Sequence, residues 1–264
     1  MNTSDDTILF HQDGAIGRIR LNRPIALNAL DQTMAERFLA ICKTIRDTPS
    51  IRVVVISGEG RAFMAGGDLA YFQADIAAAP QSAPKVIGPL HEALSILTSL
   101  PQLVVASLHG AVAGAGVSLG LACDLAIAAV GTRFNMAYAK IGASPDGSAS
   151  WSLPRVVGLH KALELTLLAE TFDAAEAQRL GIVSKVVPAE ALAEETENLV
   201  QRLAAGPSFA YARTKQLLRN SSAHTLEEQM DAEAASFVAC AATKDFVEGV
   251  GAFFDKREPR FRGE

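Results

Sequence analysis

A glycine-rich stretch, residues 109–124, constrains the fold of this chain more than any other part of its sequence. It reads His-Gly-Ala-Val-Ala-Gly-Ala-Gly-Val-Ser-Leu-Gly-Leu-Ala-Cys-Asp and follows residues 103–108, a β-branched apolar run typical of a buried strand. The small apolar residues at its end favour a buried helix. A strand, a glycine turn and a helix in succession point the unpaired N–H groups of the helix N-terminus toward a cavity. The stretch therefore indicates either a tightly packed turn or half of a binding site.

The composition is that of a globular protein, with 49% hydrophobic and 20% charged residues in 264. A net charge of −5 argues against a general affinity for nucleic acid or for an anionic membrane surface. Cys42, Cys123 and Cys240 are scattered, without the spacing of a disulfide framework or a metal site. No apolar run approaches the roughly 20 residues of a membrane span, and residues 1–6 form no apolar leader. We therefore expect a cytoplasmic protein that binds no metal, no nucleic acid and no membrane.

The first part of the chain predicts a mostly parallel sheet. A strand, an amphipathic helix and a second, continuously apolar strand follow one another, which is the order of a βαβ unit. In sequence we predict strands at 8–10 and 16–21 around a turn, a helix at 30–47 that Asp31 caps, and a buried strand at 52–57.

The later elements are mostly helical. Residues 74–84, rich in Ala, Pro, Gln and Ser, read as a mobile surface segment. Residues 208–264 read as entirely helical, with no further strand. Between these two segments the patterns predict helices at 86–100, 162–170, 174–180 and 190–205, and strands at 103–108, 124–129 and 182–187.

A second glycine loop, residues 58–69, follows the buried strand of the βαβ unit. The carboxyl ends of strands are where open α/β sheets bind their ligands. Gly66 and Gly67 can turn a backbone N–H inward, and Asp68 can begin a helix. Together with the stretch 109–124, this loop can aim two N–H donors at one oxygen, which is the geometry of an oxyanion hole.

Two titratable side chains are candidates for chemistry. Asp146 lies in the turn 144–147, Ser-Pro-Asp-Gly. It fits either the N-cap of the helical segment that follows or a carboxylate in an apolar pocket that moves protons. His91, on the predicted helix 86–100, fits either a structural or a catalytic role.

Several motifs occur in an order that points to one family. They are Arg-Pro at 23–24 with Asn-Ala-Leu at 28–30, Gly-Arg-Ala-Phe-Met-Ala-Gly-Gly-Asp-Leu at 60–69, the stretch 109–124, Leu-Pro-Arg-Val-Val-Gly at 153–158, and Phe-Phe-Asp-Lys-Arg-Glu-Pro-Arg-Phe at 253–261. Over essentially its full length the chain resembles the enoyl-CoA hydratase/isomerase (crotonase) superfamily. The resemblance implies an α/β fold, a crotonase-type spiral of ββα units with a helical C-terminal region. It divides the chain into a core with CoA-binding and oxyanion-hole loops, residues 1–205, and a helical trimerisation region, residues 206–264.

The resemblance also implies an acyl-CoA thioester substrate, a homotrimer or dimer of trimers, and no cofactor beyond the coenzyme A of the substrate. It implies that Gly67 and Ala115 donate the two N–H groups that hold the thioester oxygen. Ala26 stands where relatives often carry a Lys or Arg that faces the CoA phosphates. Recognition of the nucleotide is therefore expected from Arg23, Lys256 or a neighbouring subunit. Further expected substrate neighbours are Ala65, Gly66, Asp68, Leu69, Gly114, Ser118 and Trp151.

The sequence departs from the hydratases of the superfamily at two positions. Those enzymes carry a pair of glutamates where this chain has Ser118 and Tyr138, and neither residue can serve as one of two carboxylates that activate and protonate a water. Asp146 remains, in an Ile-Gly-Ala-Ser-Pro-Asp-Gly pattern similar to that of the ring-epoxide phenylacetyl-CoA isomerases, whose Asp shuttles a proton. We therefore predict an isomerase of enoyl- or ring-type acyl-CoA with Asp146 as acid and base. Tyr138 and Trp151 would then suit an aromatic or branched acyl group as pocket walls.

Three alternatives stay open. One is an enoyl-CoA hydratase of fatty-acid or aromatic degradation. Another is an aryl-CoA dehalogenase, since His91 and Asp146 fall where those relatives carry a water-activating His and a nucleophilic Asp, although they have Trp in place of Tyr138. The third is a non-catalytic acyl-CoA binder on the same fold.

Overall fold

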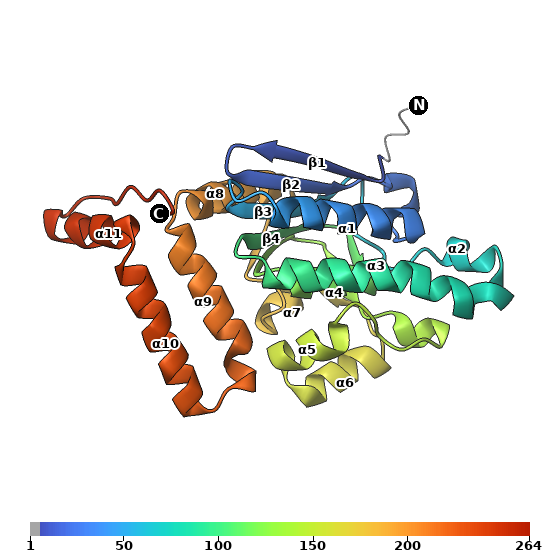
Figure 1. The fold of residues 1–264 in the computed structure, drawn as a ribbon. Coiled ribbons are helices and arrows are strands. Elements are labelled where there is room, and N and C mark those ends of the chain that lie inside the picture. The colour runs from blue at the N-terminus through green and yellow to red at the C-terminus, as the bar shows by residue number, and fades with distance from the viewer. Residues whose placement is uncertain (1–5) are drawn as a thin grey trace.

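The computed structural model describes residues 6–264, and its centre is a six-stranded sheet of order β1-β2-β3-β4-β6-β9 (Figure 1). β1 pairs antiparallel with β2, and each other neighbouring pair is parallel. The predicted mostly parallel sheet is confirmed. Its strands are β1 (Ile8–Asp13), β2 (Ile16–Leu21), β3 (Val53–Gly58), β4 (Leu103–Leu108), β6 (Leu125–Ala129) and β9 (Lys185–Val187).

Helices cover both faces of this sheet. The list is α1 (Gln32–Arg46), α2 (Leu69–Gln73), α3 (Ala79–Ser99), α4 (Ala115–Ala122), α5 (Ala149–Val157), α6 (Leu159–Leu167), α7 (Ala174–Arg179), α8 (Leu192–Ala204), α9 (Ser208–Asn220), α10 (Leu226–Ala241) and α11 (Lys244–Asp255), with a short 3-10 helix, η3 (Tyr138–Ile141), before α5. The helix predicted at 30–47 is confirmed as α1, and the side chain of Asp31 accepts a hydrogen bond from the Met34 N–H at its start.

The continuous β-branched run of β3 is explained by burial on both faces. Val54 and Ile56 belong to the large core cluster that contains the inner faces of α1 and α3. Val53 and Val55 point to the opposite side, where they join Val200 of α8 in a smaller cluster. Because neither face of the strand meets water, alternation of polar and apolar residues would be unfavourable there.

The prediction of a mobile segment at 74–84 is wrong in its second half. α3 begins at Ala79, and Pro84 and Pro89 lie inside the helix. Each internal proline removes one backbone hydrogen bond and is unfavourable for an isolated helix. Burial of the apolar face of α3, including Leu90 and Leu97, against the core offsets that cost.

A second, three-stranded sheet was not predicted from the sequence. It consists of β5 (Ala111–Ala113), β7 (Arg133–Asn135) and β8 (Phe172–Asp173), in the order β5-β7-β8. Phe134 of β7 stacks on Phe172 of β8 with 5.5 Å between ring centroids. Strands of two or three residues are too short for an apolar period to be recognised in the sequence. The sheet forms through contacts between residues that are far apart in the chain.

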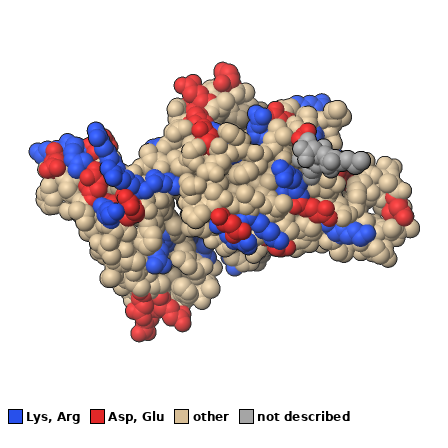
Figure 2. All heavy atoms as spheres, turned by 45° about the horizontal axis from the view of Figure 1, so that its top comes forward, with Lys and Arg blue, Asp and Glu red and all other residues tan. Residues whose placement is uncertain are grey.

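The C-terminal helices α9, α10 and α11 extend to one side of the sheet as an arm (Figure 1). The helical prediction for residues 208–264 is confirmed up to Asp255, and residues 256–264 follow without a helix. Within the described chain no helix is long and apolar enough to cross a membrane. On the face drawn in Figure 2, acidic and basic side chains are interspersed. Residues 1–5, on which the expectation about an N-terminal leader mostly depends, lie outside the described residues.

Candidate active site

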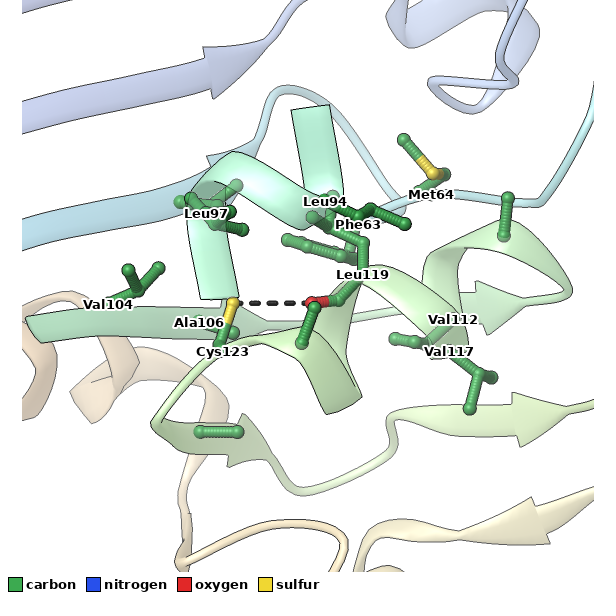
Figure 3. Close-up of a cluster of buried hydrophobic side chains, with 14 of the residues drawn as sticks. Phe63, Met64, Leu94, Leu97, Val104, Ala106, Val112, Val117, Leu119 and Cys123 are labelled. Carbon is green, nitrogen blue, oxygen red and sulfur yellow. Dashed lines mark hydrogen bonds between the residues drawn. The ribbon is translucent and has the colours of Figure 1, made fainter. Parts of the chain in front are cut away.

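The two glycine loops recognised in the sequence lie against each other. The Met64 N–H donates to the Ala111 carbonyl at 3.2 Å, and the Ala113 N–H donates to the Met64 carbonyl at 2.9 Å. Figure 3 shows Phe63 and Met64 from the first loop in the same buried cluster as Val112 and Val117 from the second. The loops after β3 and β4 therefore form one surface.

Two of the glycines are required by this close approach. A Cβ atom on Gly116 would overlap the carbonyl oxygen of Met64, and a Cβ atom on Gly110 would overlap the carbonyl oxygen of Arg61. Gly114 has φ +50° and ψ −118°, a conformation that residues with a side chain rarely adopt. The glycines of the stretch 109–124 thus serve packing and at the same time bring the start of α4 to the first loop.

Several backbone N–H groups at this junction have no partner among the residues that the structure describes, and those of Gly67 and Ala115 are two of them. Leu30 forms a bridge with Gly67: the Leu30 N–H donates to the Gly66 carbonyl, and the Asp68 N–H donates to the Leu30 carbonyl, both at 2.8 Å. In such a bridge the N–H of Gly67 points away from Leu30. Ala115 is the first residue of α4, where an N–H has no acceptor in its own helix. The Gly67 and Ala115 N–H groups are therefore free to bind an external acceptor.

Asp146 is connected to the start of α4 through the ring of Tyr138. The Tyr138 hydroxyl donates to Asp146 Oδ1 at 2.6 Å, a length typical of a hydrogen bond to a charged acceptor. A Cβ atom on Gly114 would lie 3.8 Å from Cζ of Tyr138, so the ring packs on the glycine turn that precedes Ala115. The carboxylate is thus one tyrosine away from the α4 N-terminus.

The alternative role of Asp146 as a helix cap is wrong. α5 begins at Ala149, its N-cap residue is Ser148, and no side chain caps it. The Asp146 carboxylate instead accepts the hydroxyl of Tyr138. The backbone of Asp146 is also held by Ser118 of α4, whose hydroxyl donates to the Asp146 carbonyl at 3.1 Å.

Tyr138 is poised as a hydrogen-bond donor through a wide pH range. Its side chain is buried, and burial raises the pKa of the hydroxyl well above its ordinary value. The neighbouring charge of Asp146 raises this pKa further, because a phenolate there would face a carboxylate. The Tyr138 hydroxyl therefore stays protonated and available to the carboxylate.

His91 reaches the same turn from α3. Its Nε2 atom accepts a hydrogen bond from the Gly147 N–H at 3.1 Å. His91, Asp146 and Trp151 line a cleft of about 610 Å³ to which α9 contributes Arg219. The indole of Trp151 is half exposed in the same region.

Arg23 is engaged within the protein. Its guanidinium lies 2.8 Å from Asp68 and 3.0 Å from Asp31 and also donates to the Ala29 carbonyl. Asp68 in turn caps α2 by accepting the Ala70 N–H. Arg23 thus ties together the starts of α1 and α2, on either side of the Gly67 loop.

The other predicted substrate neighbours fall into two groups. Ala65, Gly66, Asp68 and Leu69 lie on the Gly67 loop, with Leu69 exposed, and Ala26 lies half-buried in the turn after Arg23. Lys256 follows α11, which lies at the opposite end of the molecule from α2 (Figure 1). The chain therefore does not bring Lys256 to its own glycine loops.

Sequence reasoning missed Leu30 and Asp31 as parts of this arrangement. Leu30 fixes the orientation of the Gly67 peptide, and Asp31 shares Arg23 with Asp68. Leu30 belongs to the Asn-Ala-Leu motif, and Asp31 follows it directly before a helix. This position was a signal that the motif orients the neighbouring backbone. Among residues 6–264 no group of His, Cys, Asp and Glu is arranged to hold a metal ion.

The fold and the paired glycine loops correspond to a known class. The sequence profile of the family described as enoyl-CoA hydratase/isomerase matches residues 11–264, and the chain belongs to that family. A 1,2-epoxyphenylacetyl-CoA isomerase of Escherichia coli (strain K12) is 34% identical over 258 residues, which cover 97% of this chain and 98% of the relative. A probable enoyl-CoA hydratase of Rhodobacter capsulatus is 36% identical with the same coverage.

Solved structures confirm the crotonase-type fold. The crystal structure of an enoyl-CoA hydratase from Polaromonas sp. JS666 superposes with a TM-score of 0.91 at 36% sequence identity. The match covers 97% of this chain and 99% of that one. The chain is therefore an acyl-CoA enzyme of this family. Relatives that are named for different activities have similar sequence identities to it.

Proposed function

We propose that the protein is an acyl-CoA isomerase in which Asp146 moves a proton between two carbons of the acyl chain. The N–H groups of Gly67 and Ala115 would hold the thioester carbonyl oxygen. When a proton leaves the carbon next to the thioester, negative charge develops on that oxygen, and two preorganised donors stabilise it. The unpaired state of both donors in the described chain supports this role.

The observation that carries the proposal is the placement of the Asp146 carboxylate, since Asp31 and Asp68 at the same junction are both paired with Arg23. Asp146 is held by Tyr138, whose ring packs on the turn before α4, and the family resemblance implies that the hydratases carry their two glutamates where this chain has Ser118 and Tyr138. One carboxylate can take a proton at one carbon and return it at another, with no net gain or loss of atoms. The same step would shift a double bond or open a strained ring. The similarity to the 1,2-epoxyphenylacetyl-CoA isomerase agrees with this reaction class.

Hydration is the second candidate, because a relative at 36% identity is named a probable enoyl-CoA hydratase. It needs one group to activate water and another to protonate carbon. Asp146 and Tyr138 would have to share these tasks. The dehalogenase alternative is not favoured by the structure, since the Nε2 atom of His91 is occupied by the Gly147 N–H.

The decisive test is Asp146→Asn, assayed with 2-enoyl-, 3-enoyl- and epoxide-containing aryl-CoA thioesters. We expect isomerisation to fall by about 10²–10⁴, the usual contribution of a general acid–base group. Binding of a non-reactive acyl-CoA should change little, because the amide keeps the shape of the turn. Glu164→Gln, at a surface carboxylate paired with Lys161, is the control and should be as active as the wild type.

Three outcomes would contradict the proposal. Retained isomerisation in Asp146→Asn would remove Asp146 from the chemistry. Formation of a 3-hydroxyacyl-CoA by the wild type, without isomerisation of any substrate, would make the enzyme a hydratase. Turnover on none of the thioesters, together with tight binding, would support the non-catalytic binder.

A further inference from the structure

We propose that His91 is a positioning residue for Asp146, acting as a hydrogen-bond acceptor and not as a base. It would hold the peptide group that follows Asp146 and so fix the direction of the carboxylate. The inference rests on the proposed role of Asp146 in proton transfer.

The key observation is that one peptide group is held from both sides. The Asp146 carbonyl accepts the Ser118 hydroxyl at 3.1 Å, and the N–H of Gly147, in the same peptide, donates to His91 Nε2 at 3.1 Å. Ser118 belongs to α4 and His91 to α3. The two helices therefore grip the Asp146–Gly147 peptide between them, and Tyr138 holds the carboxylate as a third support.

The turn has little room for another arrangement. Gly147 is buried with φ +59°, and a Cβ atom there would lie 3.0 Å from Cβ of Ser118 and 3.5 Å from Cδ2 of Leu90. Among the described residues, the Gly147 N–H has His91 Nε2 as its acceptor. Loss of this acceptor would leave the N–H of a buried residue without its protein partner, which is unfavourable. A rotation of the peptide would relieve it and would carry the Asp146 side chain along.

The hydrogen bond also defines the chemical state of the imidazole. A nitrogen that accepts an N–H carries no proton of its own, so the proton of neutral His91 lies on Nδ1. Neither ring nitrogen is then free to take a proton from water while the turn is in place. His91 therefore differs in function from a water-activating histidine, although it lines the same cleft as Asp146.

The proposal separates two substitutions at one position. His91→Ala removes the acceptor, and we expect kcat to fall about ten- to hundredfold with little change in KM, as for a slightly misplaced catalytic group. His91→Gln supplies an amide oxygen near the position of Nε2, which can accept the Gly147 N–H but cannot act as a base. We expect it to restore most of kcat. Glu92→Ala, on the same helix and paired with Lys43, is the control and should keep wild-type kcat.

Amide hydrogen exchange provides a readout independent of turnover. The Gly147 amide should exchange faster in His91→Ala than in the wild type and be protected again in His91→Gln. Equal loss of kcat in both variants would show that the imidazole itself carries protons and would overturn the proposal. Wild-type kcat in His91→Ala would overturn it as well.

Failure of this inference can be told from failure of the proposed function. If Asp146→Asn is inactive and His91→Ala is fully active, only the positioning role is wrong. If Asp146→Asn keeps its activity, the proposed function is wrong, and positioning of Asp146 then has no catalytic meaning even where exchange of the Gly147 amide depends on His91.

Discussion

Tyr138 presents a neutral hydroxyl to Asp146 at a position where the family resemblance implies a carboxylate in the hydratases. A phenol donates a hydrogen bond and carries no charge, so it can stabilise the ionised form of Asp146 without repelling it. A second carboxylate at this distance would instead compete with Asp146 for one proton. The Tyr138–Asp146 pair thus offers one carboxylate and one neutral hydrogen-bond donor in place of two coupled acids.

The raised pKa of Tyr138 can be measured directly. The ultraviolet difference spectrum between wild type and Tyr138→Phe isolates its phenolate, since the chain has three tyrosines. We expect no phenolate signal from Tyr138 near pH 10, where an ordinary tyrosine ionises, because burial and Asp146 oppose the charge.

The sign of the linked stability change follows from the same shift. Between the unfolded value near 10 and the higher folded value, the folded state binds the proton more tightly. Its contribution to stability is therefore complete below pH 10 and is lost as the pH rises through the folded pKa. Tyr138→Phe should lack this alkaline slope. A Tyr138 phenolate signal in the difference spectrum with a midpoint near pH 10 would show that the hydroxyl is not held as described.

The sequence identified Asp146, Tyr138 and Ser118 separately but not the contacts between them. Asp146 stood out because it was the carboxylate left once the hydratase positions had been excluded. Its bond to Tyr138 depends on η3, which is bounded by left-handed residues at Ala137, with φ +59°, and Gly142, with φ +70°. Nothing in the local pattern of residues 134–142 predicts that geometry, because an alanine rarely adopts it.

Among the elements, one partly buried carboxylate joins α9 to the sheet. Asp124, directly before β6, lies 2.8 Å from Lys215 and 2.7 Å from Arg219, and it also accepts the Val104 N–H. Lys215 is buried, and burial lowers its pKa even with the carboxylate beside it. The charge of Lys215 therefore depends on Asp124, and the base of the C-terminal arm depends on both.

Asp124→Asn should destabilise the protein by about 3–5 kcal/mol, because it leaves a buried ammonium group without a counter-charge. Urea unfolding measures this difference. Glu195→Gln, which breaks the exposed pair with Lys185 at 2.6 Å, is the matched control and should cost at most about 1 kcal/mol. Equal effects of the two substitutions would mean that the Asp124 cluster does not anchor α9.

Strongly periodic elements were predictable, and short or irregular ones were not. The helix α1 and the strands β2, β3 and β4 have clear apolar patterns, and α1 also has an identifiable cap. All four lie where the sequence predicts them. The start of α3 was missed because its prolines argue against a helix, and packing against the core overrides that preference. β5, β7 and β8 have too few residues for a period to be recognised.

In the whole molecule, the α10 and α11 part of the arm exposes large apolar side chains. Phe237 is 65% exposed, Phe253 78% and Phe254 77%. Exposed aromatic groups in such number favour association with another surface. The trimer that the family resemblance implies would cover them.

We therefore expect the protein to sediment as a trimer or a dimer of trimers. The double substitution Phe253→Ser and Phe254→Ser should shift it toward smaller species, since each serine removes apolar area from the contact. Val130→Ser, at an exposed valine directly after β6, should leave the sedimentation unchanged. A wild type that sediments as a monomer would show that the arm has another role.

The use of backbone donors at the Gly67 and Ala115 junction has a consequence for how this chain can evolve. A main-chain N–H is inherited whatever side chain stands at its position, provided that the residue is not proline. The two N–H groups thus survive substitution of the side chains at positions 67 and 115, provided that the glycines that bring the two loops together are kept, whereas Ser118, Tyr138 and Asp146 can each be exchanged by a single codon change. New reactions of the same thioester can arise from this chain without any remodelling of its fold.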